Sequence, residues 1–368
     1  MRGVPIETQQ RRPKLTRADA IELLSPAIAR QFTPDDVVTL LRRVESETES
    51  DERQLSAAQT DLIFEHRVLP LVPSEWILGG GHDRLELDRQ AAIDQLDLTA
   101  LLVETLATLM GENIEARVLK GMASNELDYR SGLMRQSSDV DLLLQPDSLH
   151  TATELLMSDG FEPLGSVTSP TRAWKGAVLC ATTGLQVDLH SRLSVLSDPP
   201  SEILFADADL MPRTGGLALN TVDRLLHAAS HFVLTAPGSR RLTGLADITA
   251  IRFRHGLDVS AAQGRAAQLG LEWSAGLGLS IEAAILGRDP SEFEMWASPS
   301  RLEGLAYARG DRRLLFEHVL KVHRRKGLRT KLAYLGYTLA PSRIEADVRG
   351  SRRNYYLKAL PSRRQSPR

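Results

Sequence analysis

The sequence predicts an α+β fold in which a small mixed sheet is flanked by helical regions on both sides along the chain. Short alternating apolar runs, which are typical of strands, are confined to residues 113–215. Apolar residues recur at helical spacing before and after that stretch. A helical pattern also separates two of the central runs, which indicates that the sheet and at least one helix form an α/β layer.

These patterns divide the chain into four parts. An N-terminal helical region (1–112) precedes the α/β core (113–215), which is followed by a C-terminal helical region (216–330) and a basic tail (331–368). From Lys321 onward the formal charge is +12, which leaves −14 on the first 320 residues. A basic C-terminal segment of this kind is either solvated or a docking segment for an anionic partner.

Composition excludes several classes of protein. The chain has 368 residues, of which 42% are apolar and 25% charged, so it is globular rather than disordered. Its one cysteine, Cys180, cannot close an intramolecular disulfide, and its first residues are polar. No apolar run reaches the roughly 18 to 20 residues of a bilayer span. We therefore expect a cytoplasmic protein without integral membrane association.

The N-terminal region carries clear helix signals. Thr16 and Thr33 each precede acidic residues, the arrangement of an N-cap followed by a first turn that complements the helix dipole. Leucines recur at every third or fourth position between residues 98 and 109, so we expect an amphipathic helix over about 85–110.

The core contains three predicted strands, at 117–119, 140–144 and 185–189. Between the second and third, the spacing predicts a helix over about 148–157, with Gly160 as its stop signal. Beyond residue 220 the helical spacing resumes, and it predicts further helices that wall the sheet.

The strongest local signal is Ser138-Asp-Val-Asp-Leu-Leu-Leu. Side chains alternate along a strand, so Asp139 and Asp141 project from one face while Val140 and Leu142 point into the core. Two carboxylates about 6 to 7 Å apart leave room for a hard cation and a third ligand. Such pairs also occur at turns and solvated strand ends, so further acids are needed to favour a metal site.

A second acidic strand follows at Gln186-Val-Asp-Leu-His. If it pairs beside the first, Asp139, Asp141 and Asp188 converge. Three acids can hold one or two Mg²⁺ ions, and two ions about 4 Å apart can clamp the attacking and leaving oxygens of a phosphoryl displacement. His190 shares the face of Asp188. Its possible roles there are metal ligand, proton shuttle or hydrogen-bonding partner that supports the acids.

A possible phosphate site lies upstream, at Val118-Leu-Lys-Gly. This stretch ends a strand and opens a turn into a predicted helix. Gly121 lets backbone N–H groups approach a phosphate, the helix start favours negative charge, and Lys120 supplies a cation.

Together these stretches resemble the DNA polymerase beta-like nucleotidyltransferase superfamily, and more closely its uncharacterised nucleotidyltransferase family with a Lys-Gly turn. The matching stretches are Glu65-His-Arg-Val-Leu-Pro-Leu-Val, Val118-Leu-Lys-Gly, Arg135-Gln-Ser-Ser-Asp-Val-Asp-Leu-Leu-Leu, Val187-Asp-Leu-His and the helical region 227–247. The resemblance covers most of the chain and implies that 113–215 is a nucleotidyltransferase core.

The resemblance implies Mg²⁺-dependent transfer of a nucleoside monophosphate from an NTP such as ATP to a hydroxyl of a small molecule, peptide or protein, with release of pyrophosphate. By position, Asp139 and Asp141 would bind metal, and Asp188 would complete the site and help activate the hydroxyl. Gly121 would meet the triphosphate. The chain departs from the superfamily in lacking a serine directly after this glycine, since the nearest hydroxyl is that of Ser124.

Two further charged residues are candidates for the nucleotide pocket. Arg135, four residues before Asp139, either neutralises phosphate charge or pairs with a surface acid. Asp247 lies in an apolar helix, where it either pairs with Arg240 or Arg241 or lines the pocket.

His227 and His231 are four residues apart and therefore share one helical face. This spacing can bind zinc, but the residues between them lack the glutamate of the hydrolytic zinc motif. Packing or contact with the acceptor is the favoured interpretation for both.

Three classes of function remain open: a nucleotidyltransferase, a catalytically silent nucleotide-binding or scaffold protein, and a metal-dependent phosphohydrolase. The presence of Asp139, Asp141 and Asp188 favours the nucleotidyltransferase, and the altered glycine motif favours the silent binding or scaffold protein. The histidines together with the aspartates suggest the third. An acidic body with 5% aromatic residues argues against an extended nucleic-acid platform, although the basic tail leaves RNA open as an acceptor.

Overall fold

The structure is a computed structural model that describes residues 15–24, 32–45, 55–65, 67–72, 76, 81–130, 133–164, 176–193, 201–235, 241–257, 259–294 and 296. These residues form twelve α-helices and a seven-stranded mixed sheet, which confirms the predicted α+β class. The basic tail, at 331–368, lies outside the described residues.

The N-terminal region is helical, as predicted. Its α-helices are α1 (Arg17–Glu22), α3 (Pro34–Glu45), α4 (Ala57–Glu65) and α5 (Gly81–Gly111), with a 3₁₀ turn, η1 (Leu69–Leu71), between the last two. Thr16 caps α1 through a reciprocal pair of hydrogen bonds with Asp19. The leucine-rich helix starts a turn earlier than its apolar spacing indicates, because its first residues are polar.

The core sheet contains all three predicted strands and four more. Its strand order is β3-β4-β5-β2-β1-β7-β6. The bounds are β1 (Ala116–Val118), β2 (Asp139–Leu144), β3 (Glu162–Pro163), β4 (Ala177–Cys180), β5 (Gln186–His190), β6 (Ala208–Leu210) and β7 (Leu217–Leu219). The central strands β2 and β5 run parallel to each other, whereas β1 and β4 lie antiparallel on their outer sides.

The two faces of β2 have different partners. Val140, Leu142 and Leu144 are fully buried in a core formed with α5, α7 (Leu149–Ser158) and the other strands. Leu143, on the opposite face, packs instead into the larger core of the helical regions. Asp139 and Asp141 share that second face because side chains alternate along the strand. The acidic face therefore looks toward the helices that surround the sheet.

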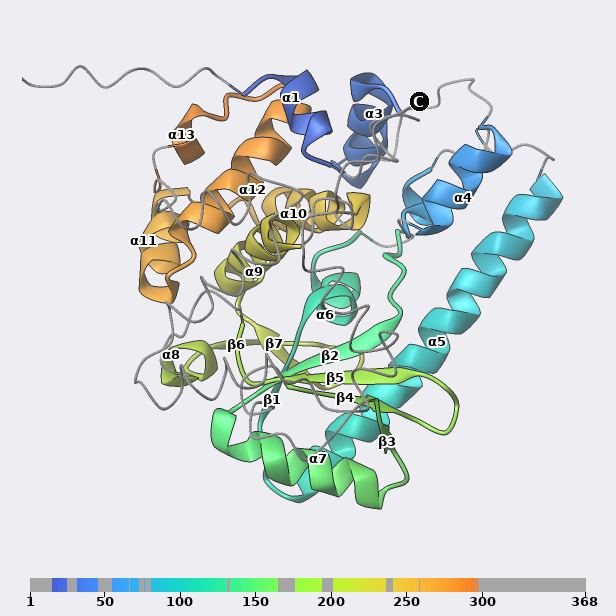
Figure 1. Cartoon of the computed structure of the whole chain (residues 1–368), viewed down its shortest axis with the longest axis vertical. Coiled ribbons are helices and arrows are strands. Elements are labelled where there is room, and N and C mark those ends of the chain that lie inside the picture. The colour runs from blue at the N-terminus through green and yellow to red at the C-terminus, as the bar shows by residue number, and fades with distance from the viewer. Residues whose placement is uncertain are drawn as a thin grey trace, which may run out of the picture.

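Helices cover both faces of the sheet. In Figure 1, α7 and the lower part of α5 lie on one side, and α6 (Lys120–Leu127), α9 (Thr221–Leu234) and α10 (Leu242–His255) lie on the other. The remaining elements are η3 (Pro146–Ser148), α8 (Ser201–Phe205), α11 (Val259–Leu269), α12 (Glu272–Ile285) and α13 (Ser291–Glu294). The acidic face of β2 is thus enclosed by α6, α9 and α10.

The helical region contains a buried ion pair of its own. Glu282 on α12 is completely buried, and Arg252 of α10 donates a hydrogen bond to its Oε2 atom. Thr249 donates to the other carboxylate oxygen at 3.2 Å, and Arg288 lies 3.5 Å from it. The charge of Glu282 is therefore matched inside the helix packing.

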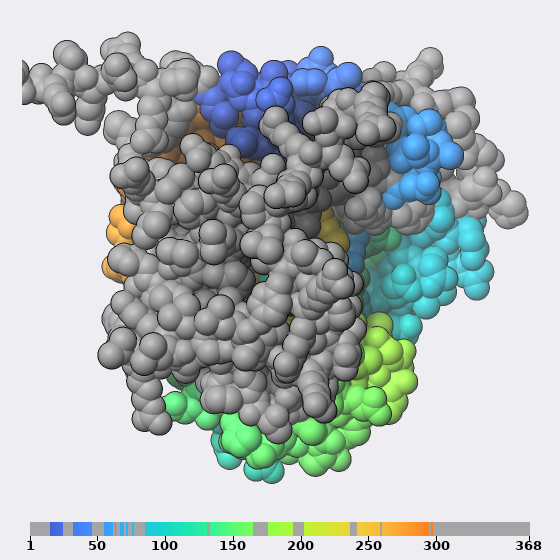
Figure 2. All heavy atoms as spheres, in the orientation of Figure 1, coloured from blue at the N-terminus to red at the C-terminus, as the bar shows by residue number. Residues whose placement is uncertain are grey.

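The space-filling view shows the N-terminal helices (blue) at the top of the molecule, α5 (cyan) along its right edge and the α7 end of the core (green) at the bottom (Figure 2). Within the described part of the chain, no helix has the length and apolar character that crossing a membrane requires.

Candidate functional site

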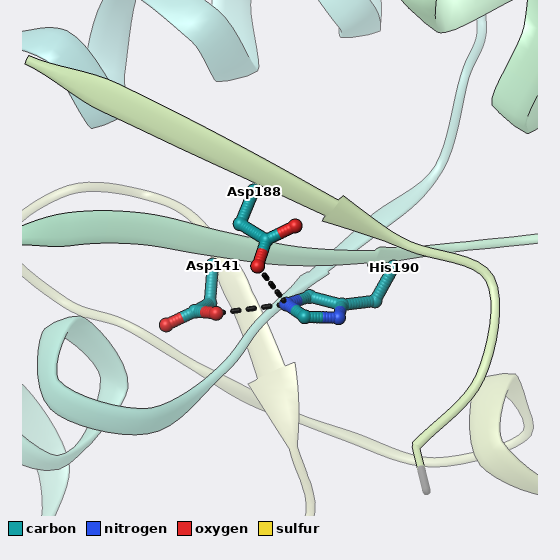
Figure 3. A group of neighbouring side chains, drawn as sticks. All are labelled: Asp141, Asp188 and His190. Atoms are coloured by element: carbon teal, nitrogen blue, oxygen red, sulfur yellow. Dashed lines mark hydrogen bonds and ion pairs between the residues drawn. The ribbon is translucent and has the colours of Figure 1, made fainter. Parts of the chain in front are cut away.

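The centre of the site is the register between β2 and β5. Asp141 lies directly opposite Asp188 on the neighbouring parallel strand. His190, two residues further along β5, directs its Nε2 atom at both carboxylates, 2.8 Å from Asp141 Oδ1 and 3.3 Å from Asp188 Oδ2 (Figure 3). Ligand atoms of these three residues all lie within 4.8 Å of one another. Two carboxylates and an imidazole so arranged are a donor set that fits a divalent cation.

Lys120 supplies a second positive group to the same carboxylate. Its Nζ atom lies 2.5 Å from Asp141 Oδ1, and its backbone is left-handed, with φ of +49°. Burial raises the pKa of Asp141, but its hydrogen bonds and charge interactions with His190 and Lys120 outweigh burial and hold the pKa well below the ordinary value. Asp141 is therefore ionised, and a lysine and a histidine hold it.

Asp188 has the opposite tendency. Burial raises its pKa, and the charges of Asp141 and Asp139 raise it further, while His190 and Lys120 oppose them. A carboxylate with a raised pKa is the stronger base of the two. The acid pair thus combines one firmly ionised carboxylate with one that accepts a proton more readily.

Asp139 stands slightly apart from this group. It is not among the three residues whose ligand atoms cluster, and its register partner on β5 is Gln186 rather than an acid. The Ser138 hydroxyl donates a hydrogen bond to Asp139 Oδ1 at 2.9 Å, and Arg67 donates one to the same hydroxyl. The expected convergence of three acids therefore takes the form of a tight pair with a third carboxylate beside it.

Arg135 is held in place by several partners. Its main chain forms two hydrogen bonds with the side-chain amide of Asn125 in α6, at 2.6 and 2.7 Å. Its Nε atom lies 3.0 Å from both carboxylate oxygens of Asp247 in α10. The Tyr129 hydroxyl also donates to Asp247, at 3.0 Å. Asp247 is thus the partner of Arg135, and it lines the cavity described below, which is one of the two roles that the sequence left open. Arg240 lies outside the described residues.

Gly121 adopts the close approach expected of a glycine, but toward a side chain. A Cβ atom at this position would overlap the Arg135 guanidinium and the Ser137 hydroxyl. The space above the start of α6 is therefore occupied by Arg135, and Ser124, one turn further, is buried.

A cavity of about 370 Å³ adjoins Asp141 of the acid pair. Asp139, Asp141 and Lys120 line its sheet side, and His227 and His231 line the wall formed by α9. The two imidazole rings meet edge to face with centroids 5.9 Å apart. Packing or contact with the substrate stays the prediction for both histidines.

Sequence reasoning missed several residues at this site. Arg67 and Arg241 line the cavity, and Tyr129 and Asn125 support Arg135. Arg67 lies within the Glu65-to-Val72 stretch that carries part of the family resemblance, so a signal existed for it. The sequence offers no comparable signal for Tyr129, whose partner lies 118 residues away.

Comparison with protein families agrees with this geometry. The model of an uncharacterised nucleotidyltransferase family matches residues 58–287, which is more than half of the chain and includes every residue of the site. The chain belongs to this nucleotidyltransferase family. The match begins in α4 and ends after α12, so the family extends over the flanking helices as well as the sheet. No curated protein matches the chain.

Proposed function

We propose that this nucleotidyltransferase uses Mg²⁺ to transfer a nucleoside monophosphate from an NTP to a hydroxyl of a small molecule, peptide or protein. One observation carries the proposal: Asp141 faces Asp188 on the neighbouring parallel strand and, together with Asp139, lines a cavity whose walls are rich in cationic groups. Two opposed carboxylates attract a metal ion, and cationic walls attract the phosphates that accompany it.

The metal site proposed here consists of Asp139, Asp141 and Asp188, with His190 as a ligand or support. Carboxylate oxygens suit Mg²⁺, and room for one or two ions follows from the spacing of the acids. Bound Mg²⁺ would supply positive charge to the phosphoryl oxygens during transfer. His190 contacts both members of the tight pair, so it also fixes their orientation.

The residues of the chain account for the rest of the reaction. Lys120, Gly121 and Ser124 at the start of α6, together with Arg135, would bind the triphosphate. The acceptor hydroxyl oxygen bonds to the α-phosphorus as the bond to the pyrophosphate oxygen breaks. Asp188 accepts the hydroxyl proton, and pyrophosphate leaves.

Two other functions make different predictions for one experiment. The guanidinium that fills the space above Gly121 is compatible with a silent binding protein, and the cavity histidines with a phosphohydrolase. The full chain is incubated with Mg²⁺ and each labelled NTP, with and without pools of hydroxyl acceptors. Acceptor-dependent pyrophosphate release with label transfer supports the proposal. Hydrolysis without transfer supports the phosphohydrolase, and tight binding without turnover supports the silent protein.

A further inference from the structure

Two arginines in the cavity wall have no role in the site described so far. Arg67 comes from the N-terminal region, just before η1, and Arg241 is the N-cap residue of α10. Both line the same cavity as Asp139 and Asp141. Among the described residues, no carboxylate forms an ion pair with either of them. Two cations that share a cavity and form no ion pair there are a site suited to an anion.

The charge balance around Arg67 supports this interpretation. Burial lowers the pKa of its guanidinium, and the positive charges of Arg241 and Arg135 lower it further, whereas the carboxylate of Asp139 acts in the opposite direction. The three arginines therefore repel one another in a partly buried place. A bound anion would relieve that repulsion.

Two of the cations that line the cavity, Arg67 and Lys120, also have an unusual backbone conformation. Among the described non-glycine residues three have a left-handed φ, and two of the three, Arg67 at +55° and Lys120 at +49°, line the cavity. Such conformations cost of order 1 to 3 kcal/mol each and tend to occur at functional sites. In addition, Thr243 and Gly244 of the first turn of α10 line the cavity, so the positive end of that helix dipole contributes to the same wall.

The position of Arg67 indicates which anion is held. Arg67 and Asp139 bind the same Ser138 hydroxyl, so the guanidinium is one side chain away from a proposed metal ligand. Phosphate oxygens that contact a metal at Asp139 would therefore lie within reach of Arg67. Lys120, at the start of α6, instead contacts Asp141 directly.

We propose that Arg67 and Arg241 form a second phosphate subsite, which binds the β- and γ-phosphates of the donor, the part that departs as pyrophosphate. This inference rests on the proposed function. It adds a contribution from outside the sheet core, since Arg67 precedes α5 and Arg241 opens α10. It also assigns a role to the Glu65-to-Val72 stretch of the sequence.

The test uses phosphate chains that carry no base, so the preferred nucleotide need not be known. Calorimetric titration of the full chain in Mg²⁺ measures the affinity for inorganic tripolyphosphate, pyrophosphate and orthophosphate. Arg67→Gln and Arg241→Gln are compared with Arg89→Gln, a control on the exposed surface of α5. Each lost charge-assisted contact should weaken tripolyphosphate and pyrophosphate binding about tenfold or more, with little change for orthophosphate or in the control.

Unchanged pyrophosphate affinity in both variants would overturn the subsite. Equal weakening for orthophosphate would also overturn it, because it would indicate a single-phosphate site such as one for a phosphorylated acceptor. Arg67→Lys keeps the charge and should retain most of the affinity, which separates charge loss from misfolding. Failure of the subsite and failure of the proposed function can be told apart. If pyrophosphate binding depends on both arginines but no NTP is turned over, the subsite proposal stands and the proposed transferase activity is wrong.

Discussion

Two buried carboxylates in this molecule, Glu282 and Asp141, are equally hidden from solvent but differ in their surroundings. Glu282, at 0% exposure, is matched by Arg252 and by the Thr249 hydroxyl within packed helices. Asp141, at 3% exposure, faces a second acid and is held by a lysine and a histidine beside a cavity. Burial alone therefore does not identify a functional acid. What distinguishes Asp141 from Glu282 is a second acid beside it and an adjoining cavity.

The largest expected effect is on the reaction itself. Asp141→Asn removes the charge shared by the proposed metal site, so nucleotidyl transfer should fall by about a thousandfold, equivalent to about 4 kcal/mol of barrier. Asp139→Asn should have an effect in the same direction. Pyrophosphate release under saturating Mg²⁺ measures it, and Asp97→Asn on the exposed face of α5 is the control. Full turnover in both site variants would show that the metal site is misassigned.

The next effect concerns stability and belongs to the helical region. Glu282→Gln removes the charge that pairs with Arg252, which is partly buried and also lies 4.0 Å from Glu292, so we expect a loss of about 1 to 3 kcal/mol of unfolding free energy. Activity per folded molecule should stay unchanged, because Glu282 is remote from the cavity. Urea unfolding measures the loss, with Glu154→Gln, an exposed position on α7, as the reference. A stable Glu282→Gln protein would mean that the pair is not a structural one.

A smaller effect is expected on metal affinity. It tests whether Lys120, unlike the arginine that pairs with Glu282, gives way to another cation. Lys120 and a metal ion compete for the same carboxylate oxygen, so Lys120→Met should tighten Mn²⁺ binding in the absence of nucleotide by about tenfold. Lys120→Arg keeps the charge and should not tighten it. Electron paramagnetic resonance of free Mn²⁺ measures the affinity directly. Weaker binding in Lys120→Met would show that the lysine supports the metal site rather than occupying part of it.

Much of the fold was predictable because it depends on local patterns. Strands with several alternating residues, such as β2 and β5, and long amphipathic helices such as α5 were predicted close to their observed bounds. The sheet's outer strands β3, β6 and β7 contain only two or three residues each, too few for an alternating pattern to be recognised. In addition, β7 joins the sheet by pairing with β1, which is distant in sequence, whereas β6 pairs only with β7.

The candidate site was predictable in part for the same reason. Alternation placed Asp188 and His190 on one face, and the parallel register then brought Asp188 opposite Asp141. Metal binding by Asp139, Asp141 and Asp188 stays a prediction. The Arg135 contact with Asp247 spans 112 residues, and the Arg67 contact with Ser138 spans 71, so both follow from how the helical regions fold over the sheet.

The left-handed backbone at Arg67 and Lys120 sets a limit on how this protein can be engineered. At such positions glycine is the residue that relaxes the main chain, and the gain in stability is of order 1 kcal/mol. The same replacement deletes a guanidinium or an ammonium group. Selection for thermal stability alone would therefore tend to remove positive charges from the cavity. A thermostabilised variant changed at Arg67 or Lys120 has to be tested for nucleotide affinity.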